Sequence, residues 1–200
     1  MVLGAVTVGV NEYVAFNPSS LPAPILRGPV QNQNLRGLAG ADLLIIAHPD
    51  LVTEAERLAA FRRVNDNLEV IVVTTEQVYN EFSSGSKDVT AIRDFAKYLY
   101  DQNGVDHLLL FGKGSYDYKD VYNRGLKTVP IYESYNSLHP LKTYSSDDYF
   151  GFMEDEEGEW QESKLGDHTL DIGVGRLPVK SAAEAAGVVD KLISYSQDIE

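Results

Sequence analysis

Four short apolar segments alternate along the chain with segments of helical periodicity. Continuous apolar runs bounded by turn residues are typical of strands buried on both faces of a sheet. Right-handed crossover connections make the strands of successive strand-helix-strand units parallel. The pattern therefore predicts an α/β fold with a parallel four-stranded sheet, whose strands lie near residues 41–47, 68–74, 107–112 and 170–175.

Helical segments flank the first, second and fourth of these strands. A Thr53-x-x-Glu56 capping box predicts a helix from residue 53 to about 64, and a Ser181-x-x-Glu184 box predicts another after the fourth strand. Between the second and third strands, a short helix over residues 75–82 precedes a longer one that Asp88 opens and Gly104 ends.

The region between the third and fourth strands is irregular. Residues 115–146 contain six Tyr together with several Pro and Gly, and predict a long excursion from the sheet. Two extended pieces around an acidic tip then predict a β-hairpin near residues 148–162.

The amino-terminal part has a different character from the rest. Its apolar start contains Val, Thr and Gly, and three prolines follow between residues 18 and 24. Proline forbids a helix interior and disfavours a central strand. We expect residues 1–36 to be the tail of a preceding β domain plus a Pro-rich linker, with Met1 starting inside a longer protein. Residues 37–200 would form one subdomain.

Charge and composition limit the possible functions. The 200 residues include 30 acidic and 17 basic residues, for a formal charge of -13, which disfavours nucleic acid and anionic lipid as partners. The absence of Cys excludes disulfides, thiolate zinc sites and a cysteine nucleophile within these residues. No apolar run approaches the length of a membrane span.

Two strand ends carry candidate chemistry. His48 follows the first strand beside Asp50, where a general base could work, although a turn or capping role is favoured because no nucleophile lies nearby. The third strand runs into Gly112-Lys113-Gly114, which could cradle a ligand but lacks the spacing of a phosphate-binding loop. Neither feature by itself defines an active site.

Acidic residues suggest a cation site. They are Asp147, Asp148, Glu154, Asp155, Glu156, Glu157 and Asp171. If a strand-end loop, the hairpin tip and the start of the fourth strand meet at one sheet edge, their oxygens would suit a hard cation such as calcium. Spacing alone favours the alternative, a solvated acidic turn.

Several motifs resemble one family. They are ADLLIIAHP at 41–49, VYNEFSSG at 78–85, TAIRDF at 90–95, LLFG at 109–112, SDDYFG at 146–151 and IGVGRLP at 172–178. In this order, over about residues 30–200, they resemble the gingipain-type cysteine peptidases. The resemblance implies a caspase-like α/β fold of two subdomains, of which this chain would be the first.

The resemblance also implies where function lies. The catalytic His and Cys of the family belong to the second subdomain, no position here matches them, and we expect this chain alone to be inactive.

The parent protein would be an extracytoplasmic endopeptidase at the outer membrane surface, and would remove carboxyl-terminal secretion signals from type IX cargo and help attach that cargo to the cell surface. Its partners would be the second peptidase subdomain and protein substrates with such signals. One alternative is a non-catalytic gingipain-like binding or scaffold domain. Another is a small metal- or phosphate-binding α/β domain of receiver type. That domain would need an Asp at the end of the third strand, where Lys113 stands instead.

A calcium ion is also implied by the resemblance. The matching positions are Lys113, the turn containing Glu154, Asp155 and Glu157, and Asp171. Lys113 stands where the family has an Asp, and an ammonium group cannot ligate calcium. This residue therefore disfavours bound calcium, and we expect no other cofactor. Our hypothesis from the sequence is that the Lys113 ammonium replaces the ion and neutralises Asp171 and the hairpin carboxylates.

Overall fold

The chain divides into two units, Met1–Asn32 and Gln33–Glu200. The computed structural model describes residues 14–23, 26, 28–122, 124–125, 127–134, 138–139, 143–158 and 169–197. In the first unit the described residues include one 3-10 turn, η1 (Pro18–Ser20), which the Asn17 side chain caps. The assignment of residues 1–36 to a preceding β domain and linker stays a prediction.

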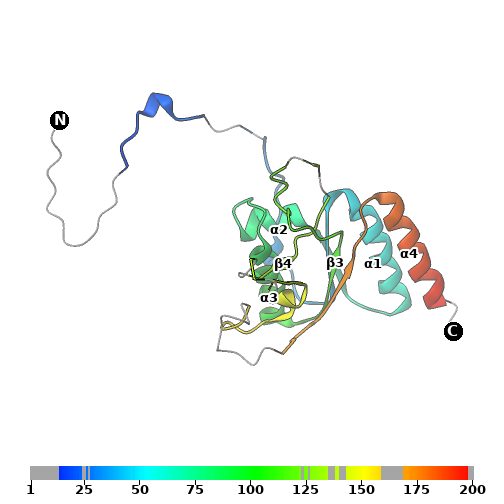
Figure 1. Ribbon diagram of the computed structural model, residues 1–200. Helices are drawn as coiled ribbons and strands as arrows, with labels where there is room; N and C mark the ends of the chain where they lie inside the picture. The colour runs from blue at the N-terminus through cyan, green and yellow to red at the C-terminus, as the bar shows by residue number, and fades with distance from the viewer. Residues whose placement is uncertain are drawn as a thin grey trace. The chain divides into compact units, whose positions relative to one another are not determined.

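The second unit is built on a four-stranded parallel sheet with the order β2-β1-β3-β6 (Figure 1). Its strands are β1 (Ala41–Ala47), β2 (Val70–Thr74), β3 (Val105–Phe111) and β6 (Gly173–Leu177). Every pair among them is parallel. The four predicted strands and their parallel arrangement are confirmed, although β2 and β6 begin later than the apolar runs suggest.

Helices cover both faces of this sheet. On one face lie α2 (Thr75–Phe82) and α3 (Val89–Asn103), and on the other lie α1 (Val52–Asn65) and α4 (Ala182–Gln197), which pack side by side (Figure 1). The alternation of strand side chains separates two cores. Leu44, Ile46 and Leu108 face α3, whereas Ile45, Ala47 and Phe111 face α1.

The residues that cap the helices are only partly those predicted from the sequence. The Thr53 capping box is not formed, because a 3-10 turn, η3 (Pro49–Leu51), leads directly into α1 and places Thr53 inside the helix. A capping box forms instead between Thr74 and Gln77 at the start of α2. Asp88 caps α3 by accepting a hydrogen bond from the Thr90 amide (2.9 Å), and Gly104 ends this helix with φ 93°.

The predicted hairpin needs correction in its first arm. Residues Asp148–Gly151 form a 3-10 helix, η4, and the second arm near 160–162 lies outside the described residues. Consecutive residues from Tyr149 to Met153 are buried, which the one-sided burial of a hairpin arm does not allow. A short antiparallel pair occurs elsewhere, between β4 (Tyr132–Glu133) and β5 (Ser145–Ser146).

Candidate functional site

The carboxyl end of β1 positions His48 as a structural cap. Its Nδ1 accepts a hydrogen bond from the Asp50 amide (3.2 Å) at the start of η3. Burial lowers the pKa of His48, outweighing the nearby Asp50 carboxylate, so the ring is held neutral with Nδ1 as an acceptor. Asp50 itself pairs with Lys127 at 2.7 Å. The favoured capping role of His48 is thereby confirmed.

The glycine loop after β3 is occupied by its own chain. The Gly112 amide donates to the Leu177 carbonyl (2.9 Å), and the Lys113 amide donates to Val179 (3.0 Å). Gly112 has φ 149°, and a Cβ at this position would lie 2.9 Å from Val129 Cγ2. Because these amides are already used, the loop joins β3 to the chain after β6 and is not a phosphate cradle.

Arg176 of β6 holds the irregular excursion against this edge. Its Nε and one terminal nitrogen bind both Asp147 carboxylate oxygens, at 2.8 and 2.7 Å. Its remaining terminal N–H groups donate to the carbonyls of Gly112, Val129 and Pro130 at 2.8–2.9 Å. All five N–H donors of the guanidinium therefore have partners. The Arg176 side chain is 9% exposed.

The predicted calcium positions lie at two different edges of the sheet. The parallel register pairs His107 with Gly173 and Phe111 with Leu177. Asp171 therefore precedes β6 at the amino edge, whereas Lys113 follows β3 at the carboxyl edge, more than about 13 Å away at 3.3 Å per residue. The hypothesis that the Lys113 ammonium neutralises Asp171 is wrong.

Asp171 instead contacts the segment that follows η4. One of its carboxylate oxygens accepts a hydrogen bond from the Met153 amide (2.7 Å), and its own amide donates to the Gly151 carbonyl (3.0 Å). The adjacent turn contains Glu154, the exposed Asp155 and the buried Glu157. The structure thus brings Asp171 to the acidic turn, as the sequence predicts, but without Lys113.

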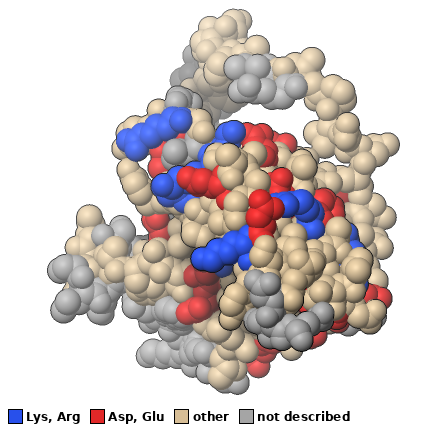
Figure 2. Space-filling model, turned by 90° about the vertical axis from the view of Figure 1, so that its right-hand side faces the viewer, with Lys and Arg blue, Asp and Glu red and all other residues tan. Residues whose placement is uncertain are grey.

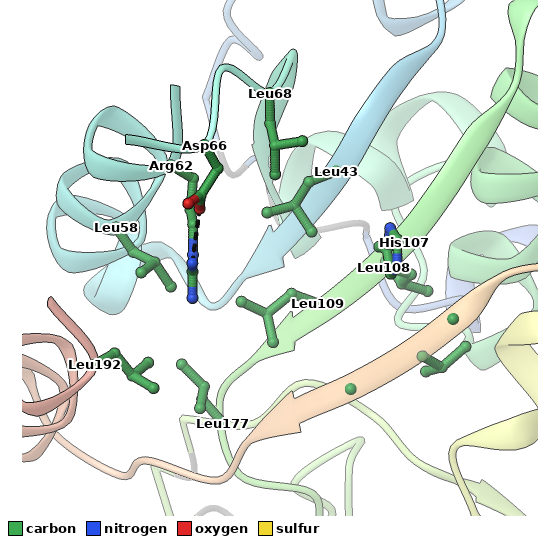
Figure 3. A pocket seen from close by; sticks show the side chains of 13 residues that line it. Leu43, Leu58, Arg62, Asp66, Leu68, His107, Leu108, Leu109, Leu177 and Leu192 are labelled. Carbon is green, nitrogen blue, oxygen red and sulfur yellow. Dashed lines mark hydrogen bonds and ion pairs between the residues drawn. The ribbon is translucent and has the colours of Figure 1, made fainter. Parts of the chain in front are cut away.

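Another candidate site is an apolar hollow on the α1 and α4 face (Figure 3). It has a volume of about 500 Å³. The side chains of Leu43, Leu109 and Leu177 form its floor, together with Gly173 and Gly175 of β6. Its walls come from Leu58 and the Arg62–Asp66 ion pair of the α1 end, from Leu68, and from Leu192 of α4.

The outer surfaces of α1 and α4 contrast with this hollow. Basic and acidic side chains are interspersed over the side of the molecule that Figure 2 shows. Arg57 links the two helices by pairing with Glu54 and Asp190, and Arg63 pairs with Glu56. Mixed charge of this kind is typical of a solvated surface. The hollow is therefore an apolar part of the sheet face that the helices leave open.

The sheet order and the placement of helices on both faces define an α/β domain of the caspase-like kind that the motifs lead us to expect. Residues 37–200 match the model of peptidase family C25, and the chain belongs to this family. A similar solved structure is dimeric latent PorU from Porphyromonas gingivalis, with 37% identity and a TM-score of 0.74 over 88% of the present chain. The chain spans 18% of the length of that protein. No curated protein matches the sequence.

The structure assigns no catalytic role to the His residue that the sequence singled out. His48 is used as a cap and has no nucleophile as a partner in that part. No helix there combines the length and apolar character needed to cross a membrane. The residues that sequence reasoning missed are structural cations, namely Arg93, Lys97 and Arg176, each bonded to main-chain carbonyls.

Proposed function

We propose that this chain is the framework subdomain of an extracytoplasmic cysteine endopeptidase that removes carboxyl-terminal secretion signals and helps attach the released cargo to the cell surface. The observation that carries the proposal is membership of peptidase family C25 together with the likeness to PorU. The nucleophile must come from outside these 200 residues, because they contain no Cys. The catalytic His would come from the same second subdomain.

Thiol alkylation of the full-length protein tests this proposal. We expect iodoacetamide to abolish its cleavage of a protein that carries a carboxyl-terminal secretion signal, because a cysteine nucleophile reacts as its thiolate. The 200-residue chain should show no hydrolysis before or after the same treatment. A full-length protein without peptidase activity would favour a binding or scaffold domain. Hydrolysis by the short chain that His48→Ala abolishes would refute the proposal.

The apolar hollow supports a site for the partner that this function requires. Parallel sheets in α/β proteins have both faces covered. Here Leu109 and Leu177 remain partly exposed, and the two glycines of β6 offer a surface without side chains. Among the described strands, β6 pairs with β3 alone and forms an edge of the sheet. We therefore assign the hollow to the second peptidase subdomain.

Gly175→Glu should uncouple the two subdomains. A Cβ at Gly175 would make only ordinary contact with Leu109 (3.9 Å), so the melting temperature of the 200-residue chain should change little. In the full-length protein the added carboxylate would be buried against an apolar partner, at a cost of several kcal/mol. We expect peptidase activity to fall by about tenfold or more. Leu138→Glu, at a fully exposed position, is the control; unchanged activity of Gly175→Glu would contradict the assignment.

A further inference from the structure

The segment that follows η4 is held by two cations of α3. Arg93 donates from Nε to the Phe152 carbonyl (2.8 Å) and from a terminal nitrogen to the Glu154 carbonyl (2.8 Å). Lys97 donates from Nζ to the Met153 carbonyl between them (2.5 Å). Three consecutive carbonyl oxygens, at residues 152–154, therefore accept hydrogen bonds from positively charged groups.

Lys97 also forms ion pairs with one carboxylate of the turn and one of α3. Lys97 lies 3.1 Å from Asp155 and 3.2 Å from Asp101. Although partial burial lowers the pKa of Lys97, the bonds to these two carboxylates outweigh it and raise the pKa, so the ammonium stays charged. Arg93 is 8% exposed and lies above the Tyr149 ring at 5.9 Å. The pair places two positive charges beside an acidic turn.

A calcium ion would compete for these same groups. Calcium takes six to eight oxygen ligands at about 2.3–2.6 Å, commonly carboxylates and main-chain carbonyls. Here the carbonyls of residues 152–154 and one oxygen of Asp171 already accept hydrogen bonds. Within the described ranges, no three Asp, Glu or His side chains are grouped so that they could hold a metal. Among the described residues, the oxygens at this turn are already bound to donors of the chain and do not fit the calcium ion that the family resemblance implies.

We propose that Arg93 and Lys97 take the place of a calcium ion at this turn. Their two positive charges equal the charge of the ion, and their N–H groups bind the type of oxygen that would ligate it. The turn and its link to Asp171 are then ordered without metal. This inference concerns residues of this chain alone and does not depend on the proposed peptidase activity.

Melting of the 200-residue chain in calcium and in chelator tests the first part of this inference. A calcium site with a Kd of about 10 μM would raise the melting temperature by about 5–10 °C at 1 mM calcium. We expect the melting temperature in 1 mM calcium to equal that in EDTA. A calcium-dependent increase of several degrees would overturn the proposal.

Variants of Lys97 test the second part. Lys97→Gln should lower the melting temperature by about 3–6 °C, equally in calcium and EDTA. It should also speed hydrogen exchange of the Met153 amide, which bonds to Asp171. Lys97→Arg keeps the charge and should retain most of the stability. Lys191→Gln on the exposed surface of α4 is the control. If Lys97→Gln behaves like Lys191→Gln, Lys97 does not replace an ion and the proposal fails.

Discussion

Arg176→Leu is expected to lower the free energy of unfolding by about 3–5 kcal/mol, the usual effect of breaking a buried ion pair by removing one partner. The leucine would leave the Asp147 carboxylate, which is 24% exposed, without its bidentate partner. It would also leave the carbonyls of Gly112, Val129 and Pro130 without their side-chain donor. Unfolding in urea, followed by circular dichroism, measures the change.

Two further variants separate the contributions at Arg176. Arg176→Lys keeps the charge but has three donors in place of five, so it should recover only part of the stability. Arg124→Leu, on the exposed part of the excursion, should change the free energy of unfolding by no more than about 0.5 kcal/mol. Equal effects of Arg176→Leu and Arg124→Leu would show that the Arg176 contacts contribute nothing to stability.

Gly112→Val is expected to destabilise the domain by about 3 kcal/mol or more. A residue with a side chain is strained at φ 149°, which costs about 1–3 kcal/mol. In addition, the new Cβ would lie 2.9 Å from Val129 Cγ2, and relieving such a contact in a packed region costs about 1–3 kcal/mol. Val129 is fully buried, so it has little room to move.

Gly175→Ala is the matched control for Gly112→Val. Gly175 is the middle residue of β6, but its φ is outside the left-handed region and a Cβ there would make only ordinary contact with Leu109. Replacing this glycine reduces the freedom of the unfolded chain and should leave stability unchanged or slightly raised. Thermal melting of the two variants provides the comparison. A Gly112→Val protein as stable as Gly175→Ala would disprove the strain argument.

The sheet was predictable because its signal is local. Each strand is a short apolar run, and burial on both faces removes polar alternation from residues 43–47 and 108–111. Strand ends were less predictable, since Leu68 and Leu170 extend the apolar runs without joining the ladder. The acidic hairpin was misjudged for a related reason, because five consecutive buried residues suit a 3-10 turn better than a strand with one solvated face.

The cation contacts were harder to predict because they join distant residues. Arg93 lies on the apolar stripe of α3, four residues after Val89 and three before Ala96, and a charge at such a position signals a buried partner. The identity of that partner, a main-chain carbonyl 59 residues away, leaves no mark in the sequence. The predicted pairing of Lys113 with Asp171 was wrong for a simpler reason. Asp171 precedes β6 and Lys113 follows the parallel strand β3, so the two residues lie at opposite edges of the sheet.

The contacts of Arg176 determine which sequence changes this region can accept. Three of its four partner residues are recognised through carbonyl oxygens, which every amino acid supplies, and only Asp147 is recognised through a side chain. Recognition at positions 129 and 130 is thus independent of residue identity. The excursion between them and Asp147 can change in length and composition while its two ends stay anchored. Different surface loops are therefore compatible with the same Arg176 contacts.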